Sequence, residues 1–291
     1  MISYRKKDEE NPILLNQEGE VPYFYYPLLE NTGMVRHGFS TRLGGVSSGE
    51  FESMNFNTTR GDSLDHVEEN FRRFCGAIGC DWDLAVMSHQ THTVNVEKVT
   101  ADMVTKGRSF WEKKPFTHVD GLVTDVPGAV LITSYADCVP LYFLDPVKKV
   151  IGLSHSGWRG TVERMGAVTV AKMQKEYGCD PTDILACVGP SICQDCYEIG
   201  PEVAEEFYKA FTEEEAEQIL AKNQAGRYQL DLWKANALIL KGAGIRREHM
   251  AITNVCTCCN PDFLFSHRAS KGLRGVLGGG LMMKGQIKDG Q

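Results

Sequence analysis

Long apolar runs, an apolar N-terminal segment and an excess of basic charge are all missing from this sequence. No run of about 18 apolar residues occurs, so we expect no membrane-spanning helix. The N-terminal segment M-I-S-Y-R-K-K-D-E-E is charged and lacks the apolar stretch of a secretion signal. The net charge is −7, which disfavours sequence-independent nucleic-acid binding. These absences predict a cytoplasmic protein without a membrane or nucleic-acid partner.

Internal repeats and low-complexity linkers are also lacking, so we expect positions 1–291 to form a single domain. The chain is 42% hydrophobic, which is enough for a sizeable core. Apolar runs predict strands at 130–133, 141–144, 150–153, 184–188 and 251–255, and helical spacing predicts helices at 161–177, 201–211 and 231–241. The polar stretch at 212–224 predicts a solvated helix or helix–loop, and the tail from position 285 should be loose. Strands and helices without a regular βαβ rhythm predict an α+β fold.

Cysteine is plentiful, with 10 residues. In a chain of this length without a secretion signal, we expect reduced thiols rather than a disulfide framework. Some of them should simply pack as small apolar side chains.

One cysteine and one histidine stand at the ends of two expected strands. The motif A-D-C-V-P at 136–140 holds Cys138, and S-H-S-G-W-R-G at 154–160 holds His155. Between the strands, D-P-V-K-K has turn chemistry. The sequence therefore predicts a hairpin that brings Cys138 and His155 to the same end of adjacent strands.

A second histidine segment, S-H-Q-T-H at 88–92, lies upstream. Its β-branched neighbours favour a strand over 89–99. On a strand, His92 would share a face with Val94 and Val96, whereas His89 would lie on the polar face. We therefore prefer His92 to His89 as a ligand. Together with Cys138 and His155 it forms a three-ligand set, which leaves a zinc ion one open position, as catalytic sites do.

The turn that follows His155 has the chemistry of an anion site. It is rich in glycine, it enters a helix, and Arg159 adds a fixed charge, so it predicts a phosphate cradle. Asp137 is either a turn-capping residue or a proton carrier. Each of these residues also has a simpler structural interpretation, because packed cysteines and surface arginines are common.

A second candidate metal site involves other cysteines. Cys193 and Cys196 form one C-x-x-C motif, and the C-T-C-C run at 256–259 contains another. Two such pairs could form a four-cysteine structural zinc site. The stretch between them is longer than common zinc-ribbon spacing, which disfavours this interpretation. The sequence supports a thioredoxin-like redox role for either pair even less, because neither pair follows a clear βα unit.

The ordered set of motifs resembles one known family. The matching blocks are H-G-F-S-T-R-L-G-G-V-S at 37–47, M-N-F-N at 54–57, G-D at 61–62, Q-T-H at 90–92, D-G-L-V-T at 120–124, A-D-C-V-P at 136–140, S-H-S-G-W-R-G at 154–160, G-P-S-I-C at 189–193, Y-E-I-G at 197–200 and F-S-H-R at 265–268. Over about 37–274 the chain is similar to the laccase-domain family of purine nucleoside phosphorylases, once described as multicopper polyphenol oxidases. It departs from the family pattern at Thr93, at His267 and in the extra cysteines.

The resemblance implies a zinc site made by His92, Cys138 and His155, and a fold of mixed β-sheets packed together and flanked by helices. It also implies phosphorolysis of adenosine, inosine and methylthioadenosine, together with deamination of adenosine. Zinc can lower the pKa of a bound water to about 7 for attack on adenine C6. Within this interpretation, Arg42 and Arg159 are candidates for holding phosphate, Asn55 for binding the nucleoside, and Asp137 for moving a proton.

Three other functions stay open from the sequence. Cys138 with His155 could act as a metal-independent nucleophile and base in a hydrolase or deamidase. Copper could replace zinc and support phenol oxidation, although the chain has only 8 histidines. A non-enzymatic module that binds nucleosides is the third alternative.

Overall fold

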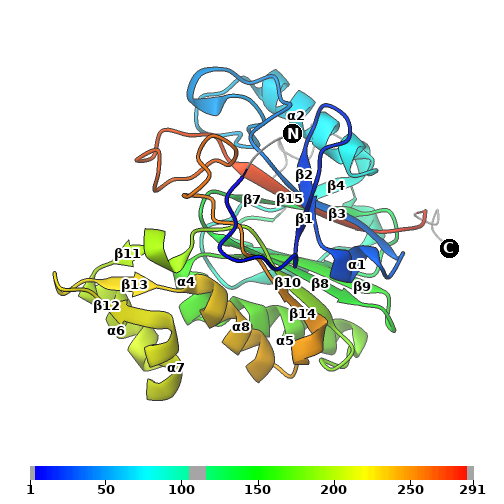
Figure 1. Ribbon diagram of the computed structural model, residues 1–291. Helices are drawn as coiled ribbons and strands as arrows, with labels where there is room; N and C mark the ends of the chain where they lie inside the picture. The colour runs from blue at the N-terminus through cyan, green and yellow to red at the C-terminus, as the bar shows by residue number, and fades with distance from the viewer. Residues whose placement is uncertain (1–3, 105–115, 287–291) are drawn as a thin grey trace.

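Two six-stranded sheets lie face to face in the computed structural model, which describes residues 4–104 and 116–286 (Figure 1). The first sheet has the order β1 (Leu14–Asn16), β2 (Tyr23–Tyr25), β3 (Val35–Ser40), β15 (Leu277–Met283), β7 (Val130–Tyr135) and β4 (Ala85–Met87). The second has the order β14 (Met250–Ile252), β10 (Leu185–Val188), β8 (Val139–Asp145), β9 (Val150–Ser156), β6 (Gly121–Thr124) and β5 (Val96–Lys98). A small third sheet joins β11 (Glu198–Ile199), β13 (Tyr228–Leu230) and β12 (Leu220–Lys222).

Strand β8 shows how both faces of the second sheet become buried. Its alternate residues Tyr142 and Leu144 belong to the core between the sheets. Leu141 and Phe143 point the other way, into a core shared with the helices. A strand that is covered on both faces reads as a continuous apolar run, which is why 141–144 lacks polar alternation.

Helices cover the outer faces of the two sheets (Figure 1). Helix α2 (Leu64–Ala77) packs on the first sheet, with Phe71 and Phe74 in the contact. The helices associated with the second sheet are α4 (Trp158–Val162), α5 (Met165–Tyr177), α6 (Pro201–Ala210), α7 (Glu213–Ile219) and α8 (Leu232–Gly242), and α1 (Pro27–Glu30) adjoins β3. The predicted α+β class, with mixed sheets packed together and flanked by helices in a single domain, is confirmed.

The expected elements differ from the structure in a few places. The helix predicted at 161–177 is interrupted: α4 ends at Val162, and Arg164 adopts a left-handed conformation (φ 62°) before α5 begins. The Arg164 guanidinium lies over the Phe211 ring and donates to the Ala210 carbonyl, so the break is tied to α6. The polar stretch at 212–224 contains α7 and then strand β12. The tail expected to be loose lies, from 287 on, outside the described residues.

No helix in the two described ranges is long and apolar enough to cross a membrane.

Candidate metal centre

The β8–β9 hairpin places Cys138 beside His155, as predicted. Pro140 on β8 pairs with His155 on β9, and Cys138 immediately precedes β8. Asp137 takes a left-handed backbone conformation (φ 81°), which turns the chain from β7 into β8. The tight turn therefore directs the thiol toward the end of β9.

His92 reaches the same point from the loop between β4 and β5. The donor atoms of His92, Cys138 and His155 all lie within 4.8 Å of one another. The distance from Cys138 Sγ to His92 Nε2 is 3.9 Å, close to the roughly 3.6 Å that a tetrahedral zinc ion sets between sulfur and nitrogen ligands. His155 is buried and His92 is exposed, so the cluster opens to solvent on one side. The residues present fit a three-ligand metal ion.

The strand expected over 89–99 was wrong for its first part, because only Val96–Lys98 is a strand. The backbone N–H groups of Thr91, His92 and Thr93 donate to the Asp120 carboxylate instead of a neighbouring strand. His92 has a left-handed backbone (φ 64°) and is exposed rather than on a buried face. His92 and not His89 lies in the cluster, but for a reason that differs from the strand argument.

Asp120 is a residue of the candidate site that the sequence did not reveal. Its Oδ1 lies 2.9 Å from His155 Nδ1, and it is fully buried. An occupied Nδ1 leaves Nε2 of His155 for a metal ion, an arrangement common behind zinc-binding histidines. Burial would raise the pKa of Asp120, but the hydrogen bond and charge of His155 and the N–H donors outweigh it and lower the pKa to about 2. The motif D-G-L-V-T contains Asp120, but a single aspartate before a strand does not disclose its partner.

The thiol and the imidazole of the cluster influence each other. Burial would raise the pKa of Cys138, yet the charges and hydrogen bonds of His155 and His92 lower it to about 6. Burial would lower the pKa of His155, yet Cys138 and Asp120 raise it to about 9. Without a metal ion, these opposite shifts favour a thiolate on Cys138 beside an imidazolium on His155.

Gly157 leaves the space in which the ligands meet. A Cβ atom at this position would lie 3.0 Å from His92 Cδ2 and 3.1 Å from Cys138 Sγ. Any larger residue would press on two of the three ligand side chains. This close approach therefore favours glycine at position 157, two residues after His155, in addition to any role in the turn.

Asp137 uses both carboxylate oxygens within the chain. Oδ1 accepts from the Thr257 hydroxyl at 2.6 Å, and Oδ2 accepts from the Arg268 backbone N–H at 2.7 Å. This geometry fits the interpretation of Asp137 as a turn residue that positions Cys138.

The predicted substrate residues have different surroundings. Arg42 donates to the carbonyls of Glu52 and Pro261, both at 2.8 Å, and lines a hollow of about 150 Å³. Asn55 is buried. Its side-chain NH₂ group donates a hydrogen bond to the Asp62 carboxylate, and its side-chain oxygen accepts one from the Val276 N–H. Arg159 is exposed, and its guanidinium lies 4.3 Å from the Trp158 ring.

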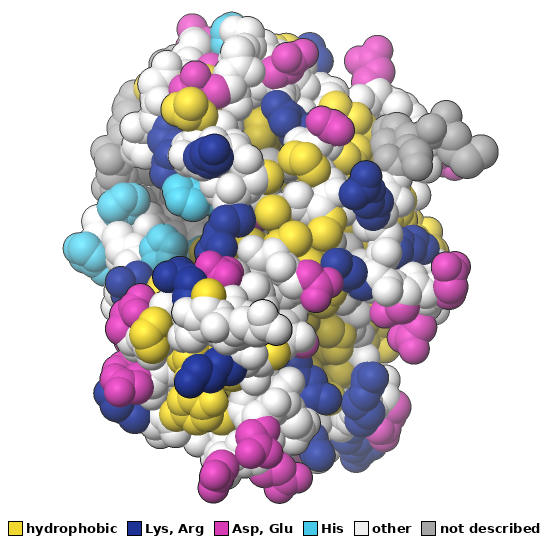
Figure 2. Space-filling view, turned by 60° about the vertical axis from the view of Figure 1, so that its left-hand side comes forward, with side chains coloured by type: hydrophobic (Ala, Val, Ile, Leu, Met, Phe, Trp, Pro, Cys, Tyr) yellow, Lys and Arg dark blue, Asp and Glu magenta, His cyan; other side chains and the backbone are white. Residues whose placement is uncertain are grey.

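Further cationic side chains lie near the three ligands. Burial and the charge of Arg60 lower the pKa of Arg274 to about 10, while the negative charges of Asp137 and Cys138 oppose this shift. Nε of Arg274 is buried without a hydrogen-bond partner within the described chain. Figure 2 shows histidine side chains gathered at one edge of the visible face, with Lys or Arg side chains beside them. Arg274 received no role from the sequence, because only the fold brings its charge within reach of Cys138.

The fold and the site together define a class: an α+β protein of two packed sheets, with a two-histidine, one-cysteine candidate metal centre at a strand end. The family model described as "Multi-copper polyphenol oxidoreductase laccase" matches residues 36–284. The chain belongs to this family.

Relatives and solved structures agree with this assignment. "Purine nucleoside phosphorylase YlmD" of Bacillus subtilis is 35% identical over 84% of this chain and 87% of its own length. "Adenosine deaminase RL5" of an unknown prokaryotic organism is 34% identical over 79% of this chain and 87% of its own length. The crystal structure of YlmD from Geobacillus stearothermophilus matches with a TM-score of 0.86 and 29% identity, over 94% of this chain and 100% of that one. These similarities support an enzyme of this family.

Proposed function

We propose that the protein is a zinc-dependent purine nucleoside phosphorylase that acts on adenosine, inosine and methylthioadenosine, with adenosine deaminase activity. The names of its relatives, which include a purine nucleoside phosphorylase and an adenosine deaminase, support both reactions.

The observation that carries the proposal is the convergence of His92, Cys138 and His155, with Asp120 behind His155. Zinc bound by this set would supply Lewis-acid activation of water or of a substrate atom at its open position. Asp120 keeps His155 in one orientation, and Asp137 holds the turn that carries Cys138. Copper is also coordinated by two histidines and a cysteine in proteins, so both metals need to be compared.

The cationic side chains near the ligands suit a phosphate substrate. In phosphorolysis, a phosphate oxygen bonds to C1′ of the ribose while the bond from C1′ to the purine nitrogen breaks, and the purine leaves with the electron pair and takes up a proton. Arg159 and Arg274 are the candidates for holding the phosphate oxygens, since guanidinium groups bind such oxygens with charge-assisted hydrogen bonds. Arg42 and Asn55 stay predictions as further substrate residues.

Product analysis tests this function. The zinc-loaded and copper-loaded proteins would each be incubated with adenosine, with and without phosphate. We expect the zinc-loaded protein to give adenine and ribose 1-phosphate only when phosphate is present. Inosine and ammonia should form in both cases, and phosphate should convert inosine further to hypoxanthine and ribose 1-phosphate. His155→Ala should lose zinc and at least about 100-fold of the activity, because removing a metal ligand costs more than changing a residue that only supports one. His89→Ala is the matched control, because His89 lies in the same loop outside the cluster. The proposal fails if the zinc-loaded protein forms none of these products, or if His155→Ala remains fully active.

The thiolate–imidazolium pair favours one second candidate. The lowered pKa of Cys138 and the raised pKa of His155 favour a thiolate nucleophile beside an imidazolium that can donate a proton, which suits a metal-independent hydrolase or deamidase. Removal of the metal by a chelator distinguishes the two functions. Activity that disappears with a chelator and returns with zinc supports the phosphorylase, whereas activity that survives chelation and is lost on alkylation of Cys138 supports the hydrolase.

A further inference from the structure

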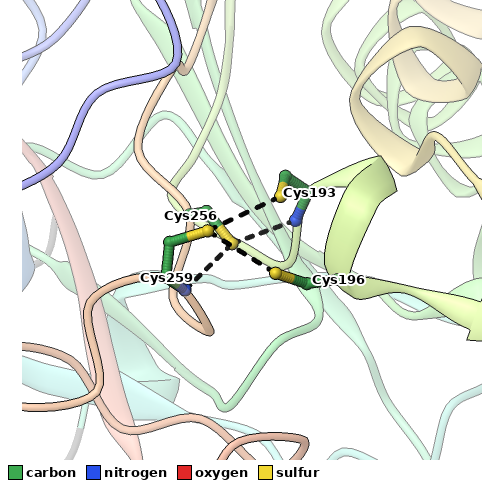
Figure 3. Close-up of side chains that lie close together, drawn as sticks. All are labelled: Cys193, Cys196, Cys256 and Cys259. Carbon is green, nitrogen blue, oxygen red and sulfur yellow. Dashed lines mark hydrogen bonds between the residues drawn. The ribbon is translucent and has the colours of Figure 1, made fainter.

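A second cluster of possible ligands lies outside the centre described above. Sγ atoms of Cys193, Cys196, Cys256 and Cys259 all lie within 4.8 Å of one another (Figure 3). Cys259 Sγ is 3.5 Å from Cys196 Sγ and 3.9 Å from Cys193 Sγ. A tetrahedral zinc ion with four thiolates sets its sulfurs about 3.8 Å apart, because each Zn–S bond is about 2.3 Å long. The four sulfurs therefore have the spacing of zinc ligands.

The convergence follows from the order of strands in the second sheet. Strands β10 and β14 are parallel neighbours, and the pairing continues past their ends through a bridge between Ser191 and Cys256. Each strand leads into one C-x-x-C motif, so the two motifs run side by side at the same edge. The long sequence separation that disfavoured this site does not matter, because parallel strands need a long crossover between them.

Backbone donors around the cluster suit thiolates. The N–H groups of Cys193 and Cys259 point to Cys256 Sγ, at 3.3 and 3.4 Å (Figure 3). Hydrogen bonds to the charged form of a sulfur favour that form. Four thiolates around a divalent ion leave net negative charge, and Lys7 lies beside the cluster, with Nζ 2.8 Å from Asp195 between the first two cysteines.

We propose that Cys193, Cys196, Cys256 and Cys259 bind a structural zinc ion at a second metal site, separate from the one formed by His92, Cys138 and His155. Four cysteine ligands close the coordination sphere, so this ion stabilises structure instead of binding a substrate. No bond to substrate forms or breaks there.

The four-cysteine site lies next to the turn that carries Cys138. Both C-x-x-C loops contact Asp137, the residue before Cys138: the Ile192 N–H donates to the Asp137 carbonyl at 3.1 Å, and the Thr257 hydroxyl donates to the carboxylate at 2.6 Å. An ion that fixes the two loops therefore also fixes the turn that presents Cys138. The four-cysteine site therefore stabilises the position of Cys138 in the centre formed by His92, Cys138 and His155.

Metal content per chain is the direct test. The wild-type protein, purified in a buffer without chelators, should hold about two zinc ions, one for each ligand set. Cys196→Ser should lose one of them and His155→Ala the other. Cys258→Ser is the matched control, because Cys258 lies next to Cys259 but outside the four, and Cys80→Ser is a distant one; both should keep two. A wild-type protein with a single zinc that His155→Ala removes and Cys196→Ser retains would overturn the proposal.

A spectroscopic measurement keeps the test decisive if a cysteine variant fails to fold. Cobalt(II) added to metal-free His155→Ala should produce the intense absorption of a four-thiolate ion, and Cys258→Ser in the same background should leave it unchanged. Alkylation followed by mass spectrometry gives an independent readout, since metal-bound cysteines should react only after chelation. A disulfide among the four cysteines of the freshly purified protein, with no cobalt absorption after reduction, would contradict the site.

Discussion

Asp120 is the residue that links the two halves of the candidate metal centre. It accepts backbone hydrogen bonds from the segment that carries His92, and it holds the ring of His155. One buried carboxylate therefore fixes two of the three ligands. Residues behind metal ligands commonly matter nearly as much as the ligands themselves.

Asp120→Asn should weaken zinc binding without removing a ligand. The amide keeps the shape of the side chain but loses the charge that supports His155, so we expect zinc affinity to fall by about 10–100-fold. Competition with a chromogenic chelator at neutral pH measures this, with circular dichroism to show that the variant is folded. Asp125→Asn, at an exposed position just after β6, is the control. Equal affinities for the two variants would refute the role of Asp120.

Gly157→Ala tests the close approach of the ligands. The added methyl group would press on His92 and Cys138. We expect zinc affinity to drop about tenfold, the lower end of the losses seen when residues that contact metal ligands are changed. Gly160→Ala serves as the control, because a Cβ there meets nothing nearer than 3.6 Å. Unchanged zinc binding in Gly157→Ala would show that His92 and Cys138 can shift to accommodate the methyl group, and that the close approach does not constrain the site.

At the scale of single elements, strand β3 buries the side chain of a histidine, His37. His37 Nε2 accepts from the Tyr26 N–H at 2.8 Å, and its Nδ1 is 3.9 Å from the Glu30 carboxylate. Burial, with a smaller contribution from Lys284, lowers the pKa of His37 to about 4. The folded chain thus keeps this imidazole neutral at pH values where the unfolded chain would protonate it.

The stability of the protein should therefore fall in mild acid. Between pH about 6.5 and 4 the unfolded state binds a proton at His37 that the folded state does not, so the free energy of unfolding decreases as the pH falls. The shift corresponds to about 3 kcal/mol over the whole window. Urea unfolding at several pH values should show a steeper loss for the wild type than for His37→Gln, which retains an acceptor for Tyr26. His66→Gln, on the exposed part of α2, should behave as the wild type, and equal slopes for all three would contradict the role of His37.

At the scale of the whole molecule, the two sheets approach closely at β15. A Cβ on Gly279 would lie 2.7 Å from the Tyr142 hydroxyl and 3.1 Å from the Tyr135 ring. That hydroxyl crosses between the sheets and donates to the Gly38 carbonyl at 2.8 Å. The glycine therefore makes room for a buried hydrogen bond that joins the layers.

Gly279→Ala should destabilise the sandwich. Overpacking of a filled core costs about 1–3 kcal/mol, which a denaturant titration resolves. Gly76→Ala is the matched control: its Cβ would meet open space on helix α2, and it should be neutral or stabilising by up to about 1 kcal/mol. If the two variants are equally stable, the close approach at β15 is not a constraint on the fold.

Much of the local structure was predictable from the sequence. The apolar runs at β8 and β9 and the Asp-Pro turn chemistry fixed the hairpin that joins Cys138 to His155. The strand expected at 89–95 was wrong, because a buried carboxylate satisfies the backbone there in place of a neighbouring strand. β-propensity describes how a side chain fits a pleated surface, and it carries no information about such a partner.

The sequence by itself determined the α+β class, the hairpin and, through an ordered set of motifs, the three candidate ligands. Only the tertiary structure decided that Asp120 lies behind His155, that Gly157 leaves room for the ligands, and that two distant C-x-x-C motifs meet. The physical reason is how far apart along the chain the interacting residues lie. Periodicity and turn chemistry act over a few neighbouring residues, whereas these contacts depend on which strands become neighbours in the sheet.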